Sequence, residues 1–592
     1  MLYFKNEQEK QLFPQMMVRF DKAFDEKDRA LTQWRGEHGY HSTLVNQFVH
    51  STRDSLAYAY ELYNRDGQGD RRRAEDILRR IIPLQDTDPS HKTYGIWAYY
   101  TEEPLTQMAP PDWNWADFCG KELMHILLDH REKLSGELTE FVKAALLHAC
   151  NSIRIRDMEP GYTNISIMGT YVTMVGGTLL GDRSLVDYAV KRLKTLYQFN
   201  MGNGAYKEYN SPTYTLILAS DLARMLKYVK DPEALRLIDD LNNLAWEGMA
   251  RHYHFKTKQW AGPHARAYTM LQNKELLMKI QRALDYQVSL VDLKETGIAD
   301  LLPMDFFSVD LRCPKQFIHY FTEVKKEAEI NQAFFKKEIG TAYITENYTL
   351  GNFYQSTFWN QKRNMLCYFG DEKNPAYCAL KVLHDFYDYS SGVIVAAQQK
   401  NRSVALINFM TDGGDTHCNL DMIKNATITA SDLRIRFELG GGVENLSVTQ
   451  PDKGVFVAGN GLVKIKIAVP YVKFGDYPVS FEVGQSDHQI LETGTHQDSV
   501  SMKYVDIVLY HGEKTQICFT DLEESVCGLS FEITDEEFGK DAAQAEKKGK
   551  EILVSQGTLQ VRGNCRSIPA KKFYDTFTAW VNGREYQQIY CK

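Results

Sequence analysis

The sequence predicts a two-part protein, an incomplete α/α toroid followed by a large antiparallel β-sandwich. The chain has 592 residues, which is too long for a single hydrophobic core. Apolar residues recur at helical spacing up to about residue 290, whereas β-rich runs separated by glycine-containing turns follow after about residue 305. We therefore expect a catalytic helical domain over residues 1–300 and a β-sandwich domain over residues 301–592.

Helices are predicted one after another through the first domain. Glu137–Ile155 has apolar residues at helical spacing and contains no Gly or Pro. Gly161–Leu180 is predicted as a helix in spite of its internal glycines, and connections such as Lys230–Pro232 carry typical helix-end residues. Because no fixed sequence repeat indicates a solenoid, this succession favours a toroid. The remaining helices are expected at Ser184–Phe199, Tyr214–Val229 and Pro232–His252.

Strands are predicted from short apolar runs bounded by turns. Gly392–Ala397, Val404–Phe409 and Gly461–Val469 are such runs, and Gly440–Gly442 is one of the turns. The pattern reaches the C-terminus and predicts one sandwich or two stacked sheet units. The segment 537–549 is rich in Lys, Ala and Glu and is expected to form a surface helix.

Composition excludes several classes of protein. A net charge of −8 argues against nucleic-acid binding, which needs a broad basic surface. The ten cysteines show no CxxC pair, so free thiols in a reducing compartment are expected. The charged N-terminus and the absence of an apolar run of about twenty residues predict a cytoplasmic protein without a membrane partner. The aromatic content of 12% suits sugar stacking, although β-sandwiches are also rich in Tyr.

Three tryptophans of the first domain are candidates for substrate binding. Trp97 lies in Tyr94–Tyr100, and Trp113 and Trp115 follow two prolines. Their rings could stack on sugars, or they could fill the core of the toroid.

Two further segments each open a helix. Asn164 lies in the first, where an asparagine commonly serves as a helix N-cap. In the second, Ser211 and Pro212 account for the helix start. The same segment also holds Glu208, Tyr209, Asn210 and Tyr214, which are more polar and aromatic groups than a helix start needs.

The segment Trp260–Tyr268 is the strongest candidate for a site. His264, Arg266 and Tyr268 alternate with small residues, so in an extended chain all three side chains point the same way. An imidazole, a guanidinium and a phenol on one face favour a functional role over packing.

The order of these segments resembles that of the lyases that degrade uronic-acid polysaccharides, the group of heparinase II, alginate lyase and chondroitin AC lyase. These proteins pair an α/α toroid with a C-terminal antiparallel β-sandwich. Their toroid carries an Asn-containing segment that opens a helix and a later Gly-rich, acidic segment that ends in Tyr. Tyr162–Met168 is similar to the first, and Gly204–Tyr214 is similar to the second.

The resemblance implies β-elimination on an acidic oligosaccharide. A base removes the proton α to the uronate carboxylate while hydrogen-bond donors neutralise that carboxylate. Asn164, His264 and Arg266 are suited to the second task, and Tyr214 or Tyr268 to the first, with Tyr214 slightly preferred. The family often has a second Asn or a His beside the first Asn, which this chain lacks. The imidazole is therefore expected from His264 or, second, from His384 in the sandwich.

Two other functions stay open. An inverting glycoside hydrolase on the same toroid needs two carboxyl groups, which Glu208 and a second carboxylate would supply. A non-catalytic glycan-binding protein would keep the tryptophans without needing the His264 segment. The candidates for the second carboxylate are Asp112, Asp117, Asp157 and Glu159.

No cofactor is predicted. Asp412, Asp415, His417 and Asp421 could hold a divalent ion, but a polar turn explains them better, and no metal is predicted. The sequence has no phosphate loop, dinucleotide fingerprint or GxSxG motif. The oligomeric state, the particular uronic acid and the linkage are left open.

Overall fold

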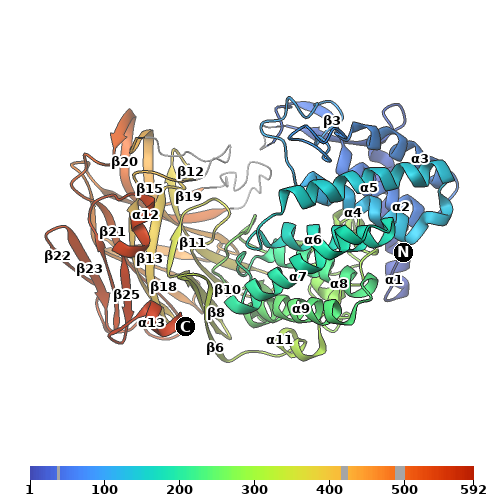
Figure 1. The fold of residues 1–592 in the computed structure, drawn as a ribbon. Helices are drawn as coiled ribbons and strands as arrows, with labels where there is room; N and C mark the ends of the chain where they lie inside the picture. The colour runs from blue at the N-terminus through green and yellow to red at the C-terminus, as the bar shows by residue number, and fades with distance from the viewer. Residues whose placement is uncertain (37–40, 415–424, 487–500, 592) are drawn as a thin grey trace. The chain divides into compact units, whose positions relative to one another are not determined.

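The computed structural model describes residues 1–36, 41–414, 425–486 and 501–591, and the chain divides into two compact units. The helical unit comprises Met1–Gly202, Tyr214–Trp246 and Asn273–Lys315. The sandwich unit comprises Asn203–Thr213, Glu247–Gln272 and Gln316–Lys592. The predicted order of helices and then antiparallel strands is confirmed (Figure 1). However, the boundary is not a single point near residue 300, because two segments of the first half belong to the sandwich unit.

The helices of the first half match the predicted ones within a few residues. In α5, Ser135 caps the N-terminus by accepting a hydrogen bond from Leu138 N at 3.1 Å, and Asp157 ends the helix with a positive φ of 41°. The helices are α1 (Glu7–Ala23), α2 (Thr52–Arg65), α3 (Asp70–Ile81), α4 (Trp115–His130), α5 (Gly136–Arg156), α6 (Thr163–Leu180), α7 (Arg183–Asn203), α8 (Pro212–Tyr228), α9 (Pro232–His252) and α10 (Lys274–Ala283).

Helix α6 is central to the helical unit, because every residue from Thr163 to Gly177 is buried. Its internal glycines permit this packing. A Cβ atom on Gly169 would lie 2.7 Å from Asp117 Oδ1 of α4. Helix α4 packs against α2, α5 and α6. The glycines that weaken the helix signal in the sequence thus serve close helix contacts.

A small antiparallel sheet in the helical unit was not expected from the sequence. It consists of β1 (Phe24–Asp25), β2 (Ala30–Arg35) and β3 (Gln47–Ser51) in that order. Thr32 pairs with His50, and β3 leads directly into α2.

The sandwich unit contains three stacked antiparallel sheets. The first has the order β19-β20-β15-β11-β10-β8-β7-β6, with β12 beside β11, the second β16-β17-β18-β21-β14-β13-β9, and the third β22-β23-β24-β25-β26. The strands are β6 (Glu327–Phe335), β7 (Glu338–Thr345), β8 (Tyr348–Phe353), β9 (Gln355–Thr357), β10 (Met365–Gly370), β11 (Pro375–His384), β12 (Tyr387–Asp388), β13 (Gly392–Gln399), β14 (Arg402–Phe409), β15 (Thr427–Gly441), β16 (Ser447–Asp452), β17 (Val455–Gly459), β18 (Lys464–Phe474), β19 (Ser480–Ser486), β20 (Met502–Cys518), β21 (Ser525–Thr534), β22 (Gln544–Lys548), β23 (Glu551–Gln556), β24 (Leu559–Asn564), β25 (Thr578–Val581) and β26 (Arg584–Glu585).

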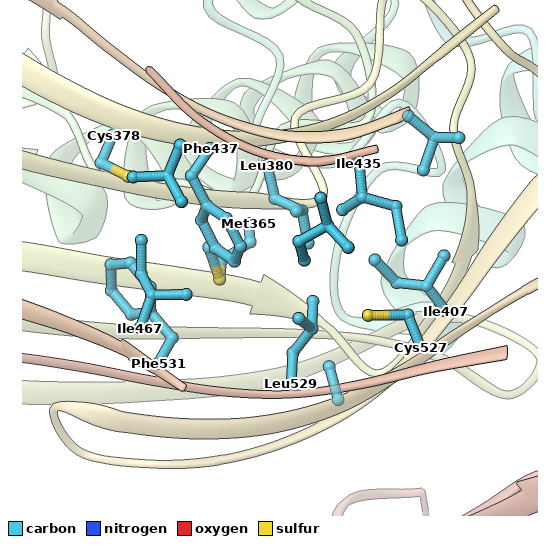
Figure 2. Packing of buried hydrophobic residues seen from close by; sticks show 14 of the residues in the cluster. Met365, Cys378, Leu380, Ile407, Ile435, Phe437, Ile467, Cys527, Leu529 and Phe531 are labelled. Atoms are coloured by element: carbon cyan, nitrogen blue, oxygen red, sulfur yellow. The ribbon is translucent and has the colours of Figure 1, made fainter. Parts of the chain in front are cut away.

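The second sheet is buried on both faces. Ile394 and Ala396 of β13 belong to the core shared with the first sheet, where Phe437 and Phe531 stack with ring centroids 6.0 Å apart (Figure 2). Val393 and Val395 of the same strand pack in the core shared with the third sheet. This double burial explains why Gly392–Ala397 is continuously apolar instead of alternating.

The expectation of a surface helix over 537–549 was wrong. Residues Gln544–Lys548 form β22, which pairs with β23 at the edge of the third sheet. The alternating contacts of an edge strand override the helix preference of Lys, Ala and Glu, and charged side chains are typical of such an edge.

Candidate functional site

An aromatic cluster of the helical unit surrounds the start of α4. The rings of Tyr99 and Trp115 stack with centroids 3.8 Å apart. The Tyr99 hydroxyl donates to Asp112 Oδ2 at 2.6 Å, and Trp115 Nε1 donates to Thr52 Oγ1 at 3.0 Å. The Arg53 guanidinium lies 5.7 Å from the Trp115 ring. These contacts hold the half-buried Trp115 in a fixed orientation, as a sugar-stacking platform requires.

The other two tryptophans have different environments. Trp97 is fully buried, and its Nε1 donates to Ile81 O at 3.1 Å, so this ring fills the core of the helical unit. Trp113 is only half-buried and donates to Lys92 O at 2.7 Å. A stacking role is therefore compatible with Trp113 and Trp115 but not with the position of Trp97.

Asn164 is the second residue of α6 and is 2% exposed. The N-cap position belongs to Tyr162, so helix capping does not explain the asparagine. The Tyr162 hydroxyl accepts a hydrogen bond from Asn114 Nδ2 at 3.3 Å, and Arg156 Nη1 donates to Asn114 Oδ1 at 2.6 Å. These hydrogen bonds link the start of α4, the end of α5 and the residue before α6. Asn164 lies two residues after Tyr162, the last member of this chain of hydrogen bonds. Tyr214 lies half-buried in the first turn of α8.

The acidic residues considered for hydrolysis have different environments. Asp117 is 2% exposed, and its burial raises the pKa of the carboxyl group to about 7. Asp157 ends α5 and forms an ion pair with Arg192 at 2.7 Å. The backbone carbonyl of Glu159 accepts from the Ser166 hydroxyl.

A charged cluster in the sandwich unit is centred on Arg266. Its Nη1 lies 2.8 Å from Glu208 Oε1, and its Nε donates to Gln361 Oε1 at 2.9 Å. The Ser211 hydroxyl donates to the Arg266 carbonyl at 2.6 Å, and Ala267 N donates to the Gln361 carbonyl at 2.7 Å. Two side chains therefore hold the guanidinium, and two hydrogen bonds hold the backbone at residues 266 and 267.

The surroundings of Arg266 are aromatic and accessible. Its Nη2 lies 3.5 Å from the Tyr268 hydroxyl, and its Cζ lies 5.3 Å from the Trp359 ring centroid. The Arg266 side chain is 16% exposed, and Tyr268 is half-buried. A fixed cation beside a phenol and an indole can bind a carboxylate-bearing sugar.

His264 does not share this accessible position. The ring is 1% exposed, and its Nδ1 donates to Asn210 O at 2.7 Å. Burial lowers the pKa of His264 to about 3, so the ring is neutral near pH 7. The segment is not a regular strand, because the His264 and Arg363 backbones form only an isolated bridge. The expected common face of three side chains is therefore reduced to Arg266 and Tyr268.

Tyr209 and Asn210 lie next to the segment that holds Arg266. The Tyr209 hydroxyl donates to His252 Nε2 at 2.9 Å, and its ring stacks on Phe334 at 4.7 Å. Asn210 Nδ2 donates to the carbonyls of Ala261 and Pro263 at 2.7 and 3.0 Å. Ala265 N donates to the Tyr209 carbonyl at 3.0 Å, so the Tyr209 backbone and the Asn210 side chain position the segment.

His384, the second candidate imidazole, is the last residue of β11 and is 5% exposed. Its Nε2 lies 3.1 Å from the Thr429 carbonyl. Leu366, near the start of β10, pairs with Ala379 of β11. Strand β11 continues past this pair to His384, and β10 itself follows the loop that holds Gln361. The register thus brings His384 to the same end of the first sheet as this loop.

Trp359 and Gln361 were missed by the sequence analysis. They lie in the loop 358–364 between β9 and β10, which was read only as part of the β-rich half. The signal was present in the run Phe358-Trp359-Asn360-Gln361, which has more aromatic and amide groups than a connection between two strands needs.

A cavity of about 450 Å³ lies elsewhere in the helical unit. Arg224, Lys227, Asp239 and Arg312 are among its lining residues, whereas none of the predicted site residues lines it. Of the residues in the predicted polar turn, Asp415, His417 and Asp421 lie outside the described residues, and Asp412 accepts a hydrogen bond from Ala570 N at 2.6 Å. The described cysteines are free thiols. Within the described ranges, no helix is long and apolar enough to cross a membrane.

Buried neutral histidines predict acid sensitivity of the sandwich unit. Burial lowers the pKa of His252 and His264 to about 3 and that of His254 to about 4, from an ordinary 6.5. As the pH falls, these imidazoles take up a proton in the unfolded chain before they do so in the folded chain. The stability that the neutral, buried rings contribute is therefore fully present above pH 6.5 and is lost as the pH falls toward 4. We expect each ring to lower the free energy of unfolding by about 1.4 kcal/mol at about pH 5.5, relative to its value well above pH 6.5.

Thermal unfolding of the full chain between pH 7.5 and 4.5 measures this effect. His254→Gln should flatten the pH dependence, whereas His319→Gln, which changes an exposed ring in the same unit, should leave it unchanged. Equal slopes for wild type and His254→Gln would contradict the assignment.

Comparison with known proteins places the fold. A family model described as a domain of unknown function (DUF8769) matches residues 10–284. No curated protein matches the sequence significantly. Chondroitin AC lyase from Streptomyces coelicolor A3, solved in complex with chondroitin sulphate, is similar with a TM-score of 0.50 and 9% identity, covering 94% of this chain and 85% of that chain.

Two other lyases are similar at lower scores. Heparinase III has a TM-score of 0.41 and 10% identity, with 89% of this chain and 82% of that chain covered. Heparan sulfate lyase HepC from Pedobacter heparinus has a TM-score of 0.35 and 8% identity, with 85% and 79% covered. The resemblance to lyases is confirmed at the level of the fold, and the chain has the polysaccharide lyase architecture of helices followed by antiparallel sheets.

Proposed function

We propose that the protein is a polysaccharide lyase that cleaves an acidic, uronic-acid-containing oligosaccharide by β-elimination. The single observation that carries the proposal is the Arg266 guanidinium, which Glu208 and Gln361 fix beside Tyr268 and Trp359. The shared fold with chondroitin AC lyase supports the reaction class, and the chondroitin sulphate bound by that protein supports an acidic glycan.

In this proposal Arg266 neutralises the uronate carboxylate. Two fixed contacts pre-organise the guanidinium, so little reorganisation is needed as enolate charge develops. Trp359 offers an aromatic face for a sugar ring. A tyrosine in its phenolate form takes the α proton, and the bond to the 4-linked sugar breaks as the carbon–carbon double bond forms. The resulting phenol then gives the proton to the leaving oxygen. Two tyrosines are candidates for this base. Tyr268 adjoins the guanidinium, whereas Tyr214 is the base that the family resemblance implies. The resemblance also implies that Asn164 donates a hydrogen bond to the substrate carboxylate.

The test is the absorbance of the conjugated, unsaturated product when the protein is mixed with a panel of uronic-acid oligosaccharides. Arg266→Ala is expected to lower kcat/KM by about 10²–10³, the effect of losing one transition-state donor. Tyr268→Phe and Tyr214→Phe show which phenol transfers the proton, because only that variant should lose turnover while the substrate still binds.

A matched control is Arg562→Ala. Arg562 is exposed on β24, and its guanidinium lies 5.2 Å from the Trp580 ring, so it reproduces the Arg–Trp pair outside the proposed site. Its removal should leave activity unchanged. Saturated products with new reducing ends, lost in Glu208→Gln and kept in both Tyr variants, would instead support the inverting hydrolase.

A further inference from the structure

A second site is suggested by the small sheet of the helical unit. The chain turns between β1 and β2 at residues 25–29, where Arg29 N donates to the Asp25 carbonyl at 2.7 Å. His50 lies on β3, next to β2 in the sheet. The side chains of Asp25, Asp28 and His50 each present one potential ligand atom, and these atoms lie within 4.8 Å of one another.

Glu102 determines the orientation and tautomer of the His50 ring. One carboxylate oxygen of Glu102 accepts from His50 Nδ1, and the other accepts from the His50 backbone N at 3.0 Å. Because Nδ1 donates to Glu102, Nε2 is the ring nitrogen that can offer a lone pair to a cation. The His50 side chain is only 10% exposed, and Nε2 is buried without a hydrogen-bond partner among the described residues.

The two aspartates face this lone pair. Asp25 Oδ2 lies 3.7 Å and Asp28 Oδ2 lies 3.9 Å from His50 Nε2, too far for hydrogen bonds. Asp25 Oδ1 accepts from the backbone N of Lys27 and Asp28 at 2.8 and 3.0 Å, which fixes the carboxylate with Oδ2 toward the ring. Both aspartate side chains are partly exposed, at 37% and 41%, so an ion can reach them.

The charge balance of this group calls for a cation. Three carboxylates surround one imidazole, and within the described residues no Lys or Arg lies at ion-pair distance from Asp25 or Asp28. A lone pair that faces two carboxylate oxygens is unfavourable unless a positive charge lies between them. The ion pairs near the turn join other partners, such as Arg73 with Glu26 and Arg29 with Asp76.

We propose that His50 Nε2, Asp25 Oδ2 and Asp28 Oδ2 bind a Zn²⁺-type divalent ion, with Glu102 as the positioning residue. Zinc–nitrogen and zinc–oxygen bonds of about 2.0–2.2 Å put tetrahedral ligand atoms roughly 3.3–3.6 Å apart, so the distances of 3.7 and 3.9 Å from His50 Nε2 to the two aspartates need only a small closure. The imidazole favours zinc over Mg²⁺ or Ca²⁺, which prefer oxygen ligands. The carboxylate–histidine pair supplies the second-shell contact typical of zinc sites. The ion would tie the β1–β2 turn to β3, independently of the proposed lyase reaction.

The test is titration of chelator-treated full-length protein with ZnCl₂ by calorimetry. We expect one tight site, at least tenfold weaker binding in Asp28→Asn and His50→Gln, and a loss of about 10–100-fold in Glu102→Gln. Asp28→Asn changes a partly exposed side chain, so unfolding should not obscure its result. MgCl₂ should bind much more weakly.

The chain offers a matched control in His91, Asp86 and Asp88. This group has the same composition, but the His91 side chain is 58% exposed, and each ring nitrogen faces one aspartate, with Nδ1 at 3.1 Å from Asp86 and Nε2 at 3.5 Å from Asp88. Two aspartates therefore do not converge on one buried nitrogen, as they do at His50. His91→Gln should leave zinc binding unchanged. The proposal would be overturned if the wild type did not bind zinc, if zinc binding survived His50→Gln, or if Mg²⁺ bound equally well.

Discussion

Replacing Asp506 with alanine is expected to destabilise the sandwich unit by about 3–5 kcal/mol, because it leaves buried cations without their counter-charge. Asp506 of β20 is fully buried and accepts hydrogen bonds from Arg434 Nη1 at 2.6 Å and from Arg436 Nε at 2.8 Å. Both arginines lie on β15 and are 4% exposed. Asp432 also contacts Arg434, but Arg436 depends on Asp506 for its ion pair in the described network.

Hydrogen exchange of the β15 and β20 peptides measures this loss within the full chain. The control is Glu513→Ala, which removes an exposed carboxylate from the same strand and should leave protection unchanged. Asp506→Asn should fall between the two, since the amide still accepts one hydrogen bond but removes the charge. Wild-type protection in Asp506→Ala would show that water or a rearranged Asp432 compensates.

Gly351→Ala is expected to cost about 3 kcal/mol of stability and to disturb the Arg266 segment. Gly351 lies in β8, and a Cβ there would come within 1.9 Å of the Gly262 carbonyl oxygen and 2.5 Å of Pro263 N. Since these neighbours are backbone atoms, no side-chain rotation can relieve the overlap. The segment 262–263 must move, and it leads directly to His264, whose backbone pairs with Arg363.

The result that tests this prediction is a loss of both thermal stability and activity. Thermal unfolding of Gly351→Ala should shift downward, and any lyase activity should fall further than the stability loss explains. Gly512→Ala is the control, because this exposed strand position has only the end of the Tyr510 side chain near its Cβ, at 3.3 Å. An unchanged melting temperature in Gly351→Ala would mean that β8 and the segment 262–263 separate easily.

The sequence alone predicted the fold class because periodicity is a local property. Helices such as α5 and strands such as β13 were found from their apolar spacing. Local preference failed at β22, where strand pairing overrides the helix tendency of Lys, Ala and Glu. It also failed at β1–β3, whose pairing joins residues that no short window compares.

Candidate residues were recognisable by type, but their environments were not. Alternation suggested that His264, Arg266 and Tyr268 share one face, yet His264 is buried while Arg266 and Tyr268 reach the surface. Trp97 and Trp115 looked equivalent in sequence, and only packing separates a core ring from an accessible one.

The sequence by itself determined the order of helices and sheets and the segments rich in chemically useful side chains. The tertiary structure decided which side chains meet. Glu208, Arg266 and Gln361 come from three separate segments, as do Asp25, Glu102 and His50 in the helical unit. Secondary structure follows from interactions between near neighbours in the chain. Burial, charge pairing and pKa instead depend on contacts between distant segments, which are defined only once the chain has folded.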